Sequence, residues 1–94
     1  MIYIGIGSNL GKRIDNIEKA KYFLYLNGIN ITKSSKYYET LSWPDITKPK
    51  FINIVIQSDT KFTPKKFLDI FKKIEKKLGR KKAKKNSPRT CDID

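Results

Sequence analysis

The alternation of apolar and polar residues predicts three strands. Residues 2–6 alternate and are rich in β-branched side chains. Residues 29–39 begin with Ile29 and Ile31 on one side and form the second predicted strand. Residues 51–57 form the third, in which Ile52, Ile54 and Ile56 face the same way. That isoleucine face is therefore expected to lie in the core.

Two segments between and after these strands have the spacing of amphipathic helices. Residues 14–27 carry apolar side chains on one face, and Gly28 can end the helix. Thr63 and Pro64 give the second helix a strong start, as N-cap and first helical residue. Gly79 follows its last turn. The faces expected to be buried comprise Ile14, Ile17, Ala20 or Lys21 and Leu24 in the first helix, and Phe67, Phe71, Ile74 and Leu78 in the second.

The remaining segments are predicted to be turns and loops. Gly5, Gly7 and Gly11 approach the dinucleotide-binding fingerprint, but Leu10 breaks it. The spacing favours a tight turn with Ser8 or Asn9 near the helix start over a backbone that a flat ligand approaches closely. Residues 40–49 hold two prolines and form a loop, in which Trp43 is expected to be a local packing anchor.

The order of these elements predicts an α+β, ferredoxin-like fold, with an antiparallel sheet and both helices on one face. Residues 1–94 are expected to form a single domain. A basic linker, residues 80–87, is predicted to be mobile and to lead into a last strand that stops at Asp94. We therefore expect the N-terminal portion of a larger domain, with an unpaired edge beside the first strand that favours association and marginal stability.

Composition narrows the function. The net charge is +12, and residues 61–94 carry 13 basic and 4 acidic residues. Such a surface suits nucleotide phosphates, nucleic acid or an anionic membrane, or is simply a solvated lysine-rich face. One cysteine excludes an internal disulfide, and the absence of histidine excludes His-based catalysis. No apolar run approaches the roughly 20 residues that span a bilayer, so we expect a cytoplasmic protein without a membrane partner.

The strongest chemical signal is the pair Asp92 and Asp94. In an extended chain, residues two apart point to the same side, which turns Ile93 into the core. Two neighbouring carboxylates suit Mg²⁺, and Arg89 can bind phosphate oxygens. The alternative is a polar chain end without function. Asn53 within an apolar strand lies on a solvated face, or contacts a ligand on whose ring Phe51 stacks.

Four stretches together resemble the 6-hydroxymethyl-7,8-dihydropterin pyrophosphokinases of folate biosynthesis. They are Tyr-Ile-Gly-Ile-Gly-Ser-Asn-Leu-Gly at 3–11, Ser-Ser-Lys-Tyr-Tyr-Glu-Thr at 34–40, Phe-Ile-Asn at 51–53 and Pro-Arg-Thr-Cys-Asp-Ile-Asp at 88–94. Each is weak alone, but their order and spacing across the chain are specific.

The resemblance implies Mg²⁺-dependent transfer of pyrophosphate from ATP to the pterin hydroxymethyl group, with release of AMP. It assigns Asp92 and Asp94 to two Mg²⁺ ions, with Arg89 as a further catalytic residue. It also assigns two sets of binding residues: Gly7, Thr40, Phe51 and Asn53 for the pterin, and Lys72, Glu75, Lys82 and Arg89 for ATP. From the residues alone, Glu75 is expected to be a surface charge paired with lysine.

The chain departs from the family at several of these positions. Leu41 stands where proline is common, Ser87 where glycine or alanine is usual, and Lys72 where an amide is usual. Asn86 occupies a position that is aromatic in some members. The family also continues beyond the second aspartate, with further ATP and pterin contacts. The resemblance therefore leaves two expectations open, an active enzyme or an incomplete fragment with weak or no activity.

A second hypothesis is a small ferredoxin-like nucleic-acid-binding domain without catalysis. It would use the basic second half, with Phe51 and Tyr3 as stacking residues. The acidic pair would repel phosphate unless metal is bound, which argues against this reading. Dependence on Mg²⁺ separates the two hypotheses.

Overall fold

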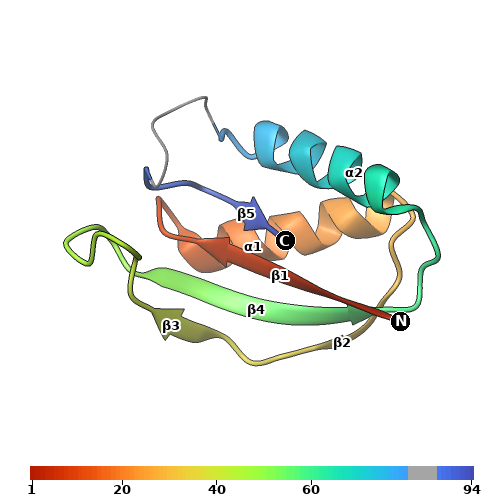
Figure 1. Cartoon of the computed structure of the whole chain (residues 1–94), viewed down its shortest axis with the longest axis horizontal. Coiled ribbons are helices and arrows are strands. Elements are labelled where there is room, and N and C mark those ends of the chain that lie inside the picture. The colour runs from red at the N-terminus through yellow and green to blue at the C-terminus, as the bar shows by residue number, and fades with distance from the viewer. Residues whose placement is uncertain (81–86) are drawn as a thin grey trace.

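The computed structural model describes residues 1–80 and 87–94. The elements follow in the order β1 (Ile2–Ser8), α1 (Arg13–Leu26), β2 (Ile31–Ser34), β3 (Tyr38–Thr40), β4 (Phe51–Ser58), α2 (Pro64–Lys77) and β5 (Asp92–Ile93) (Figure 1). Apart from the division of the second predicted strand into β2 and β3, this is the predicted order. Most predicted bounds agree to within two residues.

The strands form one antiparallel sheet in the order β2-β4-β1-β5, and β3 also pairs with β4. β1 and β4 pair along their lengths, from Ile2 opposite Ser58 to Ser8 opposite Ile52. The short β5 lies on the other side of β1. Two helices and an open antiparallel sheet confirm the predicted α+β, ferredoxin-like fold.

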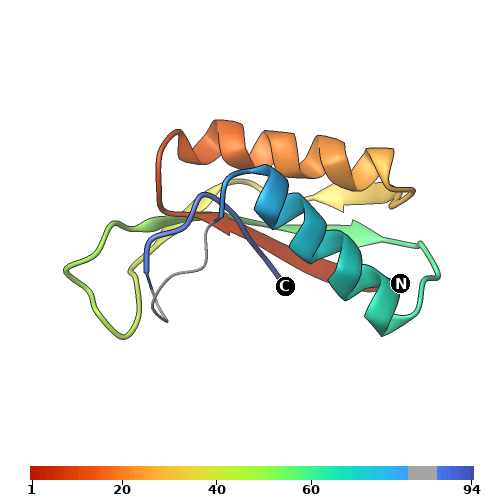
Figure 2. The ribbon, with the colours of Figure 1, turned by 90° about the horizontal axis from the view of Figure 1, so that it is seen from above.

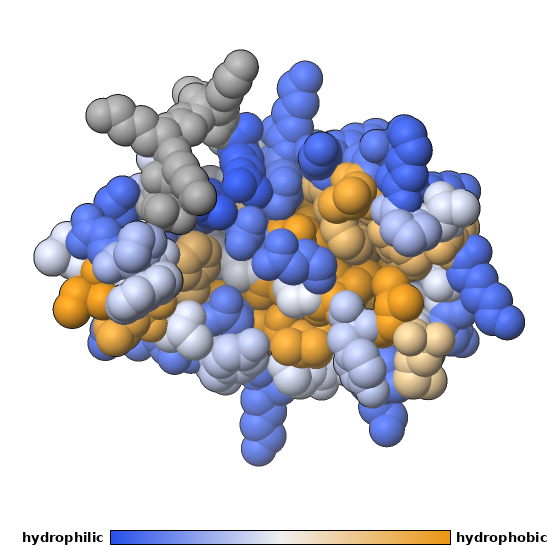
Figure 3. All heavy atoms as spheres, in the orientation of Figure 1, coloured by the Kyte–Doolittle hydropathy of each residue, from blue (hydrophilic) through white to orange (hydrophobic). Residues whose placement is uncertain are grey.

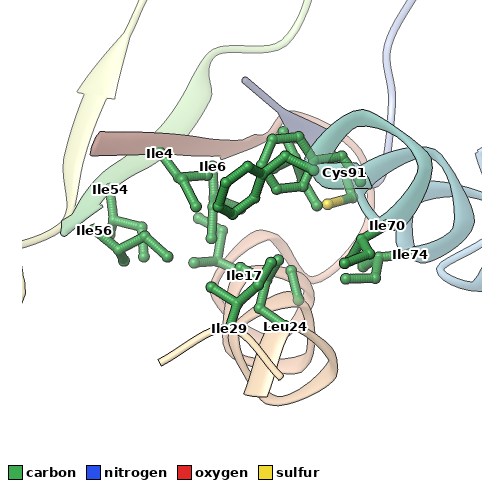
Figure 4. Packing of buried hydrophobic residues seen from close by; sticks show 14 residues of the cluster. Ile4, Ile6, Ile17, Leu24, Ile29, Ile54, Ile56, Ile70, Ile74 and Cys91 are labelled. Atoms are coloured by element: carbon green, nitrogen blue, oxygen red, sulfur yellow. The ribbon is translucent and has the colours of Figure 1, made fainter. Parts of the chain in front are cut away.

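The core lies between one face of this sheet and the two helices. Ile4, Ile6, Ile54 and Ile56 point from the central strands toward α1 and α2 (Figure 4). The two helices lie next to each other over this face (Figures 1 and 2). The opposite face is left open, with Tyr3 70% exposed. The predicted placement of both helices on one face is therefore confirmed, and the open face is available for a ligand.

Both helices end as predicted, but only α2 also begins as predicted. Gly28 and Gly79 have φ values of +86° and +92°, so each forms the left-handed turn after its helix. The Thr63 hydroxyl accepts a hydrogen bond from the Lys66 amide, at 3.2 Å, and caps α2 as expected. Neither Ser8 nor Asn9 caps α1, which begins after Lys12 without a side-chain cap.

Ile14 does not join the core, contrary to prediction. It lies in the first turn of α1 and is 47% exposed, whereas the next members of the same face, Ile17, Ala20 and Leu24, are fully buried. Ile14 lies beside Ile52, which is itself only partly buried. The first turn of α1 therefore lies at the margin of the core.

The predicted second strand is interrupted because a serine side chain replaces a backbone partner. The Ser35 amide donates to the Val55 carbonyl at 2.9 Å, and the Ser35 hydroxyl accepts from the Val55 amide at 2.8 Å. Residues 35–37 therefore leave the regular ladder between β2 and β3. Pairing with β4 resumes at Tyr38 opposite Asn53.

The loop of residues 41–50 extends beyond the end of the sheet (Figure 2). Trp43 is 81% exposed in this loop, so the prediction that it anchors local packing is wrong. Ser42, its neighbour, is the buried residue there. This part of the loop is therefore fixed by a polar contact, the hydrogen bond from Asn9 to the Ser42 hydroxyl, and not by packing of an aromatic ring.

Hydrophilic side chains project around the face shown in Figure 3, and apolar side chains gather at its centre. Neither of the helices described within residues 1–80 and 87–94 is long and apolar enough to cross a membrane. The predicted cytoplasmic location stays a prediction.

Candidate active site

The pairing of β1, β3 and β4 brings the four residues assigned to the pterin onto the open face. Gly7 lies opposite Asn53, and Thr40 lies opposite Phe51. Side chains opposite each other in an antiparallel pair point to the same side of the sheet. Because Ile52 and Ile54 turn toward the helices, Phe51 and Asn53 turn away from them.

Gly7 lies directly beneath two of these side chains. A methyl group added at Gly7 would lie 2.8 Å from Asn53 Oδ1 and 3.3 Å from Phe51 Cδ1. The Asn53 amide donates from Nδ2 to Thr40 Oγ1 at 2.9 Å. Glycine is therefore needed here for space, and the Asn53 amide has a defined orientation above the strand.

β5 adds the two carboxylates to the same face. Asp92 lies opposite Gly7, and the backbones of Asp94 and Gly5 exchange two hydrogen bonds, at 2.9 and 3.0 Å. Ile93, between them, is 5% exposed and belongs to the core. The expected alternation, with both carboxylates on one side and Ile93 inside, is confirmed.

Both carboxylates and three of the four residues assigned to the pterin, all except Thr40, border one hollow of about 240 Å³. Its lining runs from the glycines of β1 to both carboxylates and to the polar and aromatic side chains of β3 and β4: Gly5, Ile6, Gly7, Tyr38, Phe51, Asn53, Ile54, Asp92 and Asp94. One end can therefore contact a flat ring and offer hydrogen bonds, and the other presents negative charge.

Two arginines surround Asp92. Arg80 Nη1 lies 3.2 Å and Arg89 Nη1 lies 3.3 Å from the same carboxylate oxygen, Asp92 Oδ1. Arg80 also pairs with Glu75, at 2.7 Å. Arg80, the first residue of the predicted linker 80–87, therefore joins α2 to β5. Residues 81–86 of that linker lie outside the described residues.

Glu75 is a structural acceptor, and the prediction that it is a surface charge paired with lysine is wrong. It is 9% exposed, and its Oε2 accepts a hydrogen bond from the Ile93 amide at 2.9 Å. A buried carboxylate requires such partners, and here the β5 backbone and Arg80 supply them.

The carboxylate pair has the donor chemistry of a divalent cation site. Burial raises the pKa of the Asp94 carboxyl, and the Asp92 carboxylate raises it further, although Arg80 and Arg89 act against both effects. A cation beside the two carboxylates would favour their charged forms. Within residues 1–80 and 87–94, no group of three or more His, Cys, Asp or Glu side chains is placed to hold a metal. A pair nevertheless suffices for Mg²⁺ that also binds phosphate.

The residues assigned to ATP are dispersed. Arg89 and Glu75 lie on the Asp92 side of the hollow. Lys72 is exposed on α2 and does not line the hollow. Lys82 and Asn86 lie outside the described residues, so their predicted positions are not addressed.

Three residues in or beside the site were missed at the sequence level. Tyr38 lines the hollow, Arg80 pairs with Asp92, and the buried Asn9 joins two loops beside it. A tyrosine two residues before Thr40 on the same strand could have been found by alternation. The partners of Arg80 and Asn9 come from distant segments, and no local pattern shows them.

The fold and site define a ferredoxin-like domain whose open face joins a ring-sized hollow to paired carboxylates. Residues 3–94 match the family described as 7,8-dihydro-6-hydroxymethylpterin-pyrophosphokinase (HPPK). The chain belongs to this family.

Curated relatives agree with this assignment. The chain is 39% identical over 97 residues to 2-amino-4-hydroxy-6-hydroxymethyldihydropteridine pyrophosphokinase of Aquifex aeolicus, covering 99% of this chain and 58% of the relative. It is 32% identical to the Bacillus subtilis protein of that name, covering 98% and 56%. A mitochondrial folate synthesis bifunctional protein of Pisum sativum is 36% identical, covering 99% of this chain and 18% of the relative. The chain thus spans less than two thirds of the length of these relatives.

Proposed function

We propose that this chain takes part in Mg²⁺-dependent transfer of pyrophosphate from ATP to 6-hydroxymethyl-7,8-dihydropterin, giving AMP and the pterin pyrophosphate. The observation that carries the proposal is the shared hollow, which Asp92 and Asp94 border together with Gly7, Phe51 and Asn53. The relatives from Aquifex aeolicus and Bacillus subtilis are named for the same reaction class.

The ring end of the hollow suits a pterin. Asn53 and Thr40 supply an amide and a hydroxyl that can pair with the donors and acceptors on the edge of the ring. Phe51 supplies an aromatic face, and Gly7 leaves room for a flat group to lie against the strand. Orientation by these groups would hold the hydroxymethyl oxygen toward the carboxylates.

At the other end, Asp92 and Asp94 would hold the two Mg²⁺ ions. When bound, Mg²⁺ supplies charge neutralisation at the phosphate oxygens. Arg89, now paired with Asp92, would exchange that carboxylate for a phosphate oxygen. Glu75 would keep β5 in place through the Ile93 amide, and Lys72 and Lys82 remain candidates for ATP contacts.

The test is AMP release by the whole chain supplied with ATP, Mg²⁺ and the hydroxymethyl dihydropterin. Asp92→Asn keeps the shape of the side chain but removes its charge, and we expect AMP release to fall by about 100-fold or more. Asp69→Asn is the matched control, because Asp69 is exposed on α2 and pairs with Lys65. Asp69→Asn is expected to release AMP at the same rate as the unmodified chain.

AMP formation that does not require the pterin, or that Asp92→Asn leaves unchanged, would overturn the proposal. Titration of the pterin alone supplies a second criterion. A folded chain that binds neither the pterin nor Mg²⁺-ATP would show that the hollow is not the substrate site. Binding of RNA without Mg²⁺ would instead support the nucleic-acid alternative.

A further inference from the structure

Three segments that are distant in the sequence meet at one end of the sheet. They are the turn after β1, the loop of residues 41–50 and the segment 87–91 before β5 (Figures 1 and 2). The loop connects Thr40 to Phe51, two of the proposed ring contacts. The segment contains Arg89 and leads directly to Asp92.

Asn9, in the turn after β1, bonds to both of the other segments. It is 2% exposed. Its Nδ2 donates to Ser42 Oγ and to the Pro49 carbonyl, each at 3.1 Å, near the two ends of the loop. Its Oδ1 accepts from the Arg89 amide at 2.8 Å, and its own amide donates to the Arg89 carbonyl at 3.1 Å.

These partners define the orientation of the Asn9 amide. The Pro49 carbonyl can only accept and the Arg89 amide can only donate, so a reversed amide would lose both bonds. Both Nδ2 hydrogens are used. Because the amide is buried, water cannot replace a lost partner. Each donor or acceptor left without a hydrogen bond would therefore destabilise the folded state.

We propose that Asn9 is a positioning residue, which holds the ring-side loop and the phosphate-side segment in one fixed relation. The loop and the segment contact each other through this side chain, so a change in one is transmitted to the other. In the proposed reaction, this relation sets the distance between the ring contacts and Arg89 with Asp92. That consequence rests on the proposed function, whereas the mechanical link does not.

The chain carries one natural reporter on each side of Asn9. Trp43 is its only tryptophan and follows Ser42 in the loop. Cys91 is its only cysteine, is the last residue of the segment 87–91, and is 1% exposed. Trp43 emission anisotropy therefore reports motion of the loop, and Cys91 alkylation reports opening of the segment.

Two variants separate the two sides. Asn9→Asp keeps an oxygen facing the Arg89 amide but sets another oxygen against the Pro49 carbonyl. We expect Trp43 anisotropy to fall while Cys91 alkylation changes by less than about twofold. Asn9→Ala removes all three side-chain bonds, and we expect the same fall in anisotropy together with alkylation at least about fivefold faster. Ser42→Ala removes one partner and should lower anisotropy only.

A merely structural role predicts a different pattern. Alkylation in Asn9→Ala would then rise only as much as the global unfolding constant, measured in urea on the same samples, and both reporters would change together in Asn9→Asp. Either result would overturn the proposal. Asn30→Ala is the matched control, because Asn30 bonds Asp59 and Thr60 away from these segments, and neither reporter should change.

A ligand arm separates failure of this inference from failure of the proposed function. Pterin affinity is measured with and without Mg²⁺-ATP, and the ratio of the two affinities is expected to fall toward one in Asn9→Ala. Anisotropy and alkylation effects without any ligand binding would uphold the link and reject the reaction. An unchanged ratio in Asn9→Ala, in a chain that binds both ligands, would reject the proposed effect of the link on the distance between the ring contacts and Arg89 with Asp92.

Discussion

At the scale of single residues, Gly7 is the position where the site and the fold constrain each other most directly. Alanine there would place its methyl group 2.8 Å from Asn53 Oδ1, so the Asn53 side chain must move and its bond to Thr40 is strained. We expect Gly7→Ala to lower the free energy of unfolding by about 1 kcal/mol, measured by urea denaturation.

Gly5→Ala is the matched control for that change. Gly5 lies two residues earlier on the same face, and a methyl group there would meet nothing within 4 Å. Its unfolding free energy should equal or slightly exceed that of the unmodified chain. Equal effects of the two substitutions would show that the space above Gly7 is not restricted.

Tyr37 provides a prediction about pH. Its hydroxyl donates to Glu18 Oε2, and this hydrogen bond to the carboxylate raises the pKa of the Tyr37 phenol from 10.0 to about 12. Because the folded-state pKa is the higher one, the contribution to stability is present below pH 10 and is lost between pH 10 and 12. Tyr37 is 43% exposed, so that contribution is small.

Glu18→Gln tests this directly, because glutamine cannot carry the charge. Absorbance at the tyrosinate band is followed through the alkaline range, and one of the five tyrosines should titrate earlier in the variant. The double variant with Tyr37→Phe identifies that tyrosine. An unchanged titration curve in Glu18→Gln would contradict the assignment.

At the scale of elements, one carboxylate joins α2 to β5. Glu75 accepts from the Ile93 amide at 2.9 Å and pairs with Arg80 at 2.7 Å. Glu75→Ala leaves a buried amide without its acceptor, and we expect a loss of about 1–3 kcal/mol in unfolding free energy. Hydrogen exchange at the Ile93 amide should accelerate accordingly.

Glu75→Gln distinguishes the hydrogen bond from the charge. Glutamine keeps an oxygen for the Ile93 amide but loses the ion pair with Arg80. The decrease in unfolding free energy should therefore be clearly smaller in Glu75→Gln than in Glu75→Ala. The exposed Glu39→Ala, which removes surface pairs with Arg13 and Lys50, should cost less than about 1 kcal/mol. If Glu75→Gln were as damaging as Glu75→Ala, the charge would be the main contribution.

The elements themselves could be predicted because each depends on local periodicity. The isoleucines of β4 and the apolar face of α2 repeat with the strand and helix periods, and the Thr63 cap is a local signal. The break between β2 and β3 could not be predicted in this way. It depends on the Ser35 hydroxyl, which meets Val55 from a strand 20 residues away.

At the scale of the whole molecule, the site depends on strand register, and only part of it could be read from the sequence. Alternation alone placed Asp92 and Asp94 on one side of an extended segment. That Asp92 lies opposite Gly7, and Gly7 opposite Asn53, is a consequence of β1 lying between β5 and β4. The resemblance to the family assigned those residues to one site, and the strand register explains why they lie side by side.

The net charge of +12 gives a prediction for the molecule as a whole. The radius of gyration is 12.8 Å. Most pairs of charges are therefore closer together than the Debye length of about 30 Å at 0.01 M salt, but farther apart than the Debye length of about 8 Å at 0.15 M. Like-charge repulsion should therefore be screened as NaCl rises over this range. We expect a stabilisation of about 1 kcal/mol, and hence a melting temperature higher by about 4–8 °C.

Calorimetry in NaCl and in sodium sulfate at equal ionic strength separates screening from anion binding. Screening alone gives equal shifts, because it depends on ionic strength. A larger shift in sulfate at low concentration would indicate an anion bound near Arg80 and Arg89, which both lie within 3.3 Å of Asp92. Asp92→Asn removes the charged partner of Arg89 and one of the two carboxylate partners of Arg80, which keeps Glu75, and should enlarge the sulfate shift alone. A melting temperature that falls with NaCl would instead show that ion pairs such as Glu75–Arg80 outweigh the net repulsion.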